Sequence, residues 1–227
     1  MNSLHSYRRF IFLTSLVLSL SVPADPDPRE SQNNGLDIVE QSRYGEILLA
    51  PGVDWSGYSK VKLEKATVTF RENWARDLRR RSDLVVREQD EERIKTSLAT
   101  LLDEILTREV FLKEDFTMTD ESGEDVLRVT PRVVDLDIYA PDRIRNYIGG
   151  ALADSKGRMT LELEIHDSAS GELLATSWQY QEDPYDGYLD EANSASNRQA
   201  FRLMMLRWAS WLHEALDEAR AEQPELM

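Results

Sequence analysis

Apolar and polar residues alternate most regularly between residues 158 and 180. The first half of this segment has an apolar residue at every second position: Met159, Leu161, Leu163 and Ile165. This period of two is typical of a β-strand with one buried face. Residues 167–171 are turn formers that end in a glycine able to adopt positive φ, and Leu174, Trp178 and Tyr180 then share one face of a second strand. The pattern predicts a β-hairpin with a five-residue connection.

Two longer segments have helical periodicity. The first starts at Asp90, which can cap a helix N-terminus, and its apolar positions recur every three or four residues: Ile94, Leu98, Leu101, Leu102, Ile105 and Leu106. The second is predicted to start at Ser194 or Ser196 and to end near Ala221. Its apolar face contains Phe201, Met204, Trp208, Trp211, Leu212 and Ala215. Residues 71–81 predict a short amphipathic helix on the surface, with Trp74 and Leu78 at helical spacing.

Three further segments have the character of strands. Residues 60–70 change phase near Lys65, and residues 111–118 alternate weakly as in an edge strand. Residues 125–139 form a long strand region that also changes phase. Pro131 cannot donate to a β-ladder, so we expect an edge or a bulge there. These segments predict a single α+β domain: a mainly antiparallel sheet of about five strands, with two long helices packed on one face. The other face should be exposed to water and carry Thr160, Glu162, Glu164 and His166.

The N-terminus has the pattern of a secretory signal peptide. Arg8 and Arg9 precede an apolar run, and small residues end at Ala24. A retained membrane anchor is the alternative, but the run is shorter than a spanning helix needs. We therefore expect a signal peptide over residues 1–24, a flexible mature N-terminus over 25–44, the α+β domain over 45–221 and a frayed C-terminus over 222–227. The mature protein should have no integral membrane segment.

Composition excludes several classes of function. The chain has 227 residues, of which 41% are hydrophobic and 30% charged, and a formal net charge of −15. Such an acidic chain is a poor match for nucleic acid or anionic lipid, because both attract basic side chains. Cysteine is absent, which removes disulfides, thiolate metal sites and cysteine nucleophiles from consideration.

The chain has no catalytic motif of a known kind. His213 and Asp217 have helical i, i+4 spacing, but two ligands do not make a metal site, and a surface hydrogen bond is the simpler interpretation. Residues 183–191 are acidic without the alternating pattern of a calcium loop, so we interpret them as a solvated loop with weak calcium binding as the alternative. Glu162 and Glu164 could form an acid/base pair, although a solvated strand face is the simpler interpretation. We predict no catalytic, cofactor-binding or metal-binding residue, and no cofactor.

Four segments of the chain resemble a bacterial envelope family called domain of unknown function 3313. These segments are residues 47–61, 68–74, 165–175 and 207–212. The resemblance extends over about residues 46–221 and implies an exported α/β envelope domain, with no catalytic residue assigned. Members resemble lipoproteins, which need a cysteine at the first mature position, whereas Asp25 follows Ala24 here. We therefore expect a soluble periplasmic or envelope protein that is not lipidated.

Two functional hypotheses remain from the sequence. The first is a non-catalytic accessory or binding module that binds an envelope protein partner of unknown identity and no nucleic acid; its oligomeric state is unknown. Aromatic and apolar residues in three loops form the candidate interaction surface: Trp55, Tyr58, Ile144, Tyr147, Ile148, Tyr185 and Tyr188. The alternative is a carboxylate-based hydrolase acting on envelope glycan. A weaker option is an apolar ligand between the sheet and the last helix, near Trp208 and Trp211.

Overall fold

A mixed β-sheet of eight strands organises the fold. The computed structural model describes residues 35–82, 85–139, 151–153, 156–184, 190–192 and 194–221. The strand order is β1-β2-β9-β8-β6-β3-β5, and β4 also pairs with β6. The strands are β1 (Asp37–Ser42), β2 (Gly45–Leu49), β3 (Lys60–Leu63), β4 (Thr67–Phe70), β5 (Thr117–Met118), β6 (Val126–Ile138), β8 (Gly157–Asp167) and β9 (Leu173–Glu182). A separate antiparallel pair consists of β7 (Ala151–Ala153) and β10 (Asp190–Ala192).

The predicted hairpin is the antiparallel pair β8–β9. Gly171 adopts a φ of 77°, as the turn prediction required, and the Gly171 N–H donates to the Asp167 carbonyl at 2.9 Å. The pairs β6–β8, β8–β9, β9–β2 and β2–β1 are antiparallel, whereas β3 and β4 both run parallel to β6. The protein is a single α+β domain, as predicted. The sheet has eight strands rather than the expected five or so. The prediction of a mainly antiparallel sheet also missed the parallel pairs of β3 with β5 and β6 and of β4 with β6.

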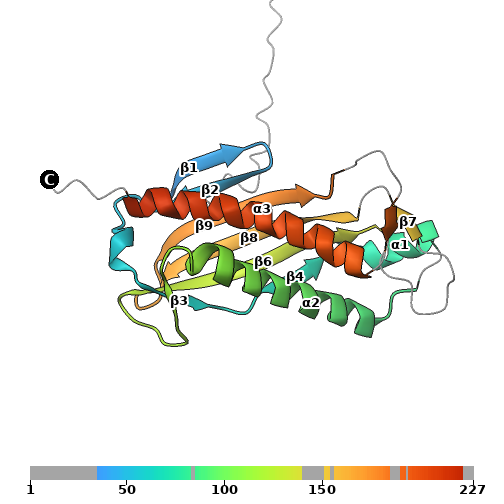
Figure 1. Cartoon of the computed structure of the whole chain (residues 1–227), viewed down its shortest axis with the longest axis horizontal. Coiled ribbons are helices and arrows are strands. Elements are labelled where there is room, and N and C mark those ends of the chain that lie inside the picture. Colours follow the sequence, from blue (N-terminus) through green and yellow to red (C-terminus); the bar gives the residue numbers. More distant parts are fainter. Residues whose placement is uncertain are drawn as a thin grey trace, which may run out of the picture. The chain divides into compact units, whose positions relative to one another are not determined.

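Three α-helices accompany the sheet in the described part of the chain. They are α1 (Trp74–Ser82), α2 (Glu88–Leu106) and α3 (Ser194–Ala221). The long helices α2 and α3 contact each other and lie on the same face of the sheet, as predicted (Figure 1). Helix α1 does not simply lie on the surface, because Trp74 and Leu78 are each only 1% exposed and belong to the core. None of these helices is long and apolar enough to cross a membrane.

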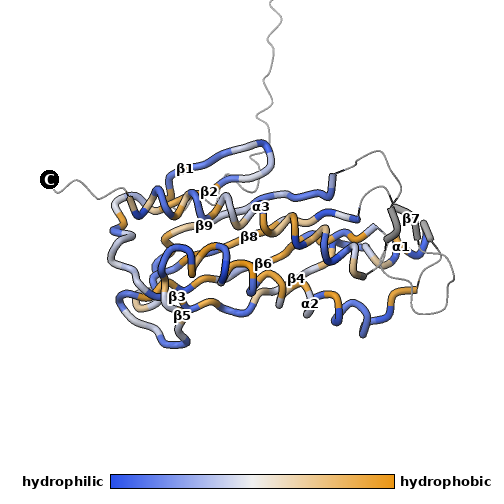
Figure 2. The backbone as a smooth tube through the Cα atoms, in the orientation of Figure 1, coloured by the Kyte–Doolittle hydropathy of each residue, from blue (hydrophilic) through white to orange (hydrophobic). Residues whose placement is uncertain are grey.

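The hydrophobic core lies between the two long helices and the inner face of the sheet. Figure 2 shows hydrophobic positions along β6 and β8 beneath these helices. The sheet contributes buried residues at every second position: Leu127, Val129 and Val133 from β6, and Met159, Leu161, Leu163 and Ile165 from β8. The helices contribute Leu98, Leu102, Ile105, Phe201, Met204, Met205 and Trp208. Each such side chain stabilises the fold by roughly 1.5–3 kcal/mol relative to an exposed position.

Pro131 sits in the centre of the sheet rather than at an edge. The Val129 carbonyl accepts from the Glu64 N–H at 2.8 Å, so by alternation the Pro131 nitrogen faces the same side. On that side β3 has ended and β4 has not begun, and Ala66 in this break donates its N–H to Asp103 of α2 at 3.1 Å. Pro131 therefore lacks its N–H at a point where no neighbouring strand of the described sheet offers an acceptor, so the sheet loses no hydrogen bond there. A bulge occurs further along β6, where Asp135 has a φ of 53°.

Two other segments differ from expectation. Residues 37–42, which we expected to belong to a flexible N-terminus, form β1, and all six are exposed. The predicted edge strand over residues 111–118 is reduced to the two residues of β5. Thr107–Phe111 instead continue α2 as a π-helix in which Val110 and Phe111 are buried.

Candidate interaction surface

The face of the sheet opposite α2 and α3, which we call the outer face, carries an ordered set of polar and aromatic side chains. Contacts with α3 show which residues of β9 point inward: the Trp208 Nε1–H donates to Ser177 Oγ at 3.4 Å, and Arg207 donates to the Gln181 side chain at 3.3 Å. Residues of the other parity, Trp178 and Tyr180, must therefore lie on the outer face.

A β-bulge explains why the sequence pattern misassigned these two aromatics. Ile165 pairs with Ala175 but the next residue, His166, pairs with Leu173, so Leu174 is an extra residue in β9. The bulge lets Leu174 join the core at 2% exposure. It also reverses the phase, so the prediction that Leu174, Trp178 and Tyr180 share one face was wrong.

Trp178 belongs to a row of four residues that crosses four strands, which we call the Trp178 row: Arg132, Glu162, Trp178 and Glu46. Arg132 is in register with Glu162, Glu162 with Trp178, and Trp178 with Glu46. The Trp178 indole N–H donates to Glu46 Oε1 at 2.8 Å. Arg132 Nε lies 3.4 Å from Glu162 Oε2, and Arg132 Nη2 donates to Glu164, two residues further along β8. Each member of the row is half-buried.

Next to this row, two tyrosines share one carboxylate. The Tyr139 hydroxyl donates to Glu182 Oε1 at 3.0 Å, and the Tyr180 hydroxyl donates to Oε2 at 2.7 Å. Burial, together with the hydrogen bond to Glu182, raises the pKa of Tyr139 to about 12. The same two causes raise the pKa of Tyr180. Both phenols therefore stay protonated donors at any physiological pH.

A buried carboxylate closes this end of the outer face. Asp137 is 2% exposed, and its Oδ2 lies 3.0 Å from Arg71 Nε and 3.4 Å from Arg158 Nη2. Arg71 follows β4 and also binds Asp77 at 3.1 Å, while Arg158 begins β8. The arrangement joins three segments that are distant in sequence. It requires the bulge at Asp135, which reverses the phase of β6 just before Asp137.

The predicted loop residues are placed only in part. Trp55 is 5% exposed and packs in the core, so it is not an exposed anchor. Tyr58 is half-buried, and its hydroxyl donates to Asp167 Oδ2 at 2.8 Å, at the turn of the β8–β9 hairpin. The other five candidates, Ile144, Tyr147, Ile148, Tyr185 and Tyr188, lie outside the described residues and stay a prediction.

The structure also decides between interpretations of the acidic and histidine residues. His213 does not simply pair with Asp217: its Nδ1 lies 2.6 Å from Oε1 of Glu114, a residue that is 9% exposed. Within the described ranges, no group of three or more side chains could hold a metal ion. In the predicted acidic loop, Asp183 Oδ2 accepts a hydrogen bond from the Lys156 backbone N–H at 2.8 Å. Residues 185–189 of this loop lie outside the described residues.

The option of an apolar ligand beneath α3 has little room. Trp208 is fully buried as a core residue, and Trp211 packs against the core. The hollow between the sheet and α3, lined by Leu163, Leu212 and their neighbours, has a volume of about 20 Å³. Such a space holds about one water molecule and no ligand.

These features define a class: an α+β domain with one face of its sheet covered by helices and the other carrying an ordered polar and aromatic surface. The chain belongs to the family described as protein of unknown function (DUF3313), whose match covers residues 39–210. This confirms the family resemblance. A search of curated proteins found no match.

Solved structures with a similar arrangement are distant. One is the PelC dodecamer from Paraburkholderia phytofirmans, with 9% identity and a TM-score of 0.37, covering 74% of this chain and 97% of that one. Another is a DUF330 protein from Xanthomonas campestris, with 10% identity and a TM-score of 0.40, covering 82% of this chain and 94% of that one. Neither likeness supports an inference about the function of this chain.

Proposed function

We propose that this protein is an exported, non-catalytic binding module of the bacterial envelope, and that its outer face binds a protein partner. The Trp178 row carries the proposal. It brings Arg and Trp to one half-exposed surface, with Tyr180 beside them, and these three residue types supply most of the binding energy in protein interfaces.

The hydrogen bonds of this surface also favour binding. Arg132 is held by two carboxylates, Trp178 by Glu46 and Tyr180 by Glu182. Side chains that are already fixed lose less conformational freedom when a partner binds, so more of the contact energy appears as affinity. The paired charges also leave few unsatisfied groups to desolvate at the centre of the face.

The competing glycan-hydrolase proposal loses the pair of residues on which it rested. Glu162 and Glu164 lie on the same face of one strand, and Arg132 binds both. A glycosidase needs two carboxyl groups facing each other across the bond to be cleaved. The observed contacts instead give these carboxylates a structural role.

Export is the part of the proposal that rests on sequence. The basic start, the apolar run and the small residues before position 25 have the pattern of a signal peptide, and the sequence contains no cysteine. Edman sequencing of the protein purified from cells tests this directly: we expect a first residue of Asp25. An N-terminus that retains the apolar run would contradict it.

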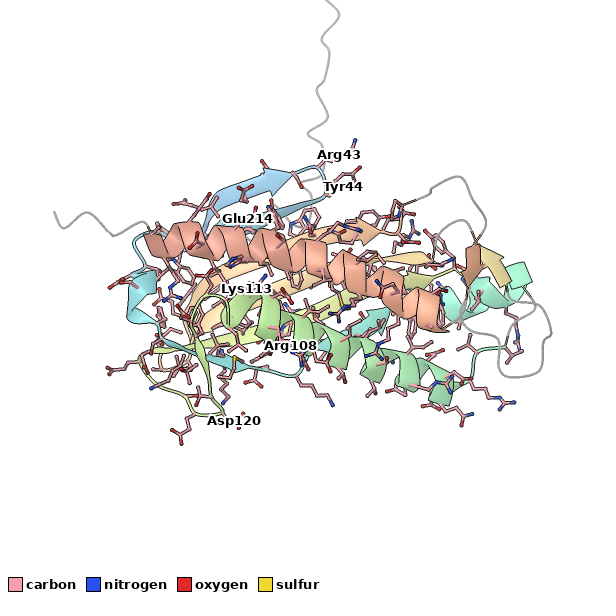
Figure 3. The ribbon with its side chains drawn as sticks, viewed as in Figure 1. Arg43, Tyr44, Arg108, Lys113, Asp120 and Glu214 are labelled. Carbon is pink, nitrogen blue, oxygen red and sulfur yellow. The ribbon has the colours of Figure 1, made fainter. Side chains whose placement is uncertain are left out.

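Site-specific photo-crosslinking in cells tests the partner surface. A benzophenone amino acid at Thr176, two residues from Trp178 on the same face, should give an adduct of defined mass. The control position is Glu214, which is exposed on α3 on the helical side of the domain (Figure 3). We expect the Thr176 adduct to disappear when Trp178→Ala is introduced into a variant that remains folded. An adduct at Glu214 alone, or one at Thr176 that survives Trp178→Ala, would overturn the proposal.

A further inference from the structure

Three basic side chains form a second row on the outer face, which we call the cationic row: Lys62, Arg128 and His166. Lys62 of β3 is in register with Arg128 of β6, and Arg128 is directly opposite His166 of β8. All three are half-buried. They come from segments that are 38 to 104 residues apart, so their meeting is a product of the sheet register, as the positions of the paired residues show.

The cationic row differs from the other basic groups of the sheet because it has no carboxylate partner in the described structure. Arg71, Arg132 and Arg158 each lie within 3.4 Å of a carboxylate oxygen, and Lys60 lies 3.0 Å from Asp125. No such ion pair involves a member of the cationic row. Arg128 Nε and His166 Nδ1 are moreover buried without a hydrogen-bond partner among the residues described. The chain has 42 acidic residues, so a shortage of carboxylates does not explain this.

This arrangement is unfavourable for the isolated protein. Groups of like charge placed directly opposite each other on neighbouring strands destabilise the pair. Burial lowers the pKa of His166, and the charge of Arg128 lowers it further, while Glu164 acts in the opposite direction. A buried polar group without a partner in a folded protein requires an explanation, and a bound ion is one.

We infer that the cationic row binds an oxyanion, either a phosphate group or a carboxylate group. Either group offers several acceptor oxygens on one centre, which can receive hydrogen bonds from a guanidinium and an imidazole at once. A bound anion would also neutralise the repulsion within the row. Partner binding at the Trp178 row is not needed for this inference, so the two proposals can fail separately.

Histidine NMR provides a direct readout. The chain has three histidines, of which His5 lies in the predicted signal peptide, so His166→Gln and His213→Gln substitutions assign the ring signals of the protein purified from cells. We titrate the protein purified from cells with sodium phosphate and, separately, with sodium acetate, against sodium chloride at equal ionic strength. Binding should shift the His166 signals saturably, with half-saturation on the order of 1 mM, and raise the pKa of His166. The His213 signals should not move.

Matched variants complete the test. Arg128→Gln should abolish the response of His166. If this variant does not fold, Lys62→Gln is used in its place, and it should weaken the response. Lys60→Gln is the control, because Lys60 lies at the same end of the sheet but is paired with Asp125; it should leave the response intact. A response to phosphate alone, acetate alone or both supports the inference and identifies the group. No response to either, an equal response to chloride, or a response that persists in Arg128→Gln would overturn it.

Discussion

Removing the Asp137 carboxylate should destabilise the protein far more than removing a carboxylate with an equally short ion pair at the surface. Asp137 and Asp125 are both associated with β6, and each lies 3.0 Å from a basic nitrogen. They differ in burial: the Asp137 side chain is 3% exposed and that of Asp125 is 43% exposed. The comparison of Asp137→Ala with Asp125→Ala therefore tests the effect of burial, together with the second guanidinium partner that, among the described residues, Asp137 has and Asp125 lacks.

The expected magnitude follows from the exposure of the partners. Breaking a fully buried ion pair costs about 3–5 kcal/mol, because the remaining charge has no compensation. Arg71 and Arg158 are 28% and 40% exposed, so water can reach them and part of that cost is recovered. We expect Asp137→Ala to lower the free energy of unfolding by about 2–3 kcal/mol, or the Tm by roughly 5–10 °C. Asp125→Ala should cause no measurable change, because exposed ion pairs contribute little.

Urea unfolding followed by tryptophan fluorescence measures both variants. The slope of unfolding free energy against urea should be the same in each, so that a change in midpoint reports stability alone. Equal midpoints for the two variants would refute the reasoning, since they would show that burial of the Asp137 cluster contributes nothing.

Three other predictions test the geometry of the outer face and its neighbours. Gly45→Ala should loosen the pairing of β2 with β9 and speed amide exchange in β2, because the added Cβ would lie 2.3 Å from the Trp178 carbonyl oxygen of β9. At Gly57 the nearest atom is 3.8 Å away, so Gly57→Ala is the control and should exchange at the wild-type rate. Burial and Arg128 lower the pKa of His166 below its ordinary 6.5, so the unfolded chain binds more protons there and stability should fall as the pH drops below about 6.5. His166→Gln should flatten that part of the urea-midpoint profile, and an unchanged slope would contradict the assignment. Burial and the hydrogen bond to Asp167 raise the pKa of Tyr58 to about 12 from 10.0, so its stabilising contribution is complete below pH 10 and is lost as the pH rises toward 12. Tyr58→Phe should remove this alkaline dependence and one late-titrating phenol from the ultraviolet titration; a Tyr58 that titrates near pH 10 would refute it.

The elements that the sequence predicts well are those whose periodicity is local. The β8–β9 hairpin has alternating residues and a turn ending in Gly171, and α3 extends over Ser194–Ala221 as its apolar spacing indicated. Each pattern repeats every two to four residues, so the element can be recognised without knowing how the rest of the chain folds.

The outer face could not be predicted, because it depends on register between distant strands. Leu174 and Asp135 each add one residue to a strand, and each addition reverses which side chains face outward. Trp178 was therefore assigned to the wrong face, and Asp137 gave no signal of its burial. Pairing Arg132 with Glu162 likewise requires the alignment of β6 with β8, which no local pattern contains. The all-exposed β1 lacks any alternation by which a strand could be identified.

Labelling of single cysteines in intact cells tests the central claim, that a partner occupies the outer face, most directly. The chain has no cysteine of its own, so Thr176→Cys and Ser210→Cys each introduce one defined thiol, on the outer face and on exposed α3 respectively. Maleimide labelling rates are compared between cells that express the protein at its natural level and the purified protein. We predict that Thr176→Cys reacts much more slowly in cells than in the purified protein, whereas Ser210→Cys reacts at a similar rate in cells and in the purified protein. Equal protection at the two positions, or none at Thr176→Cys, would contradict the account.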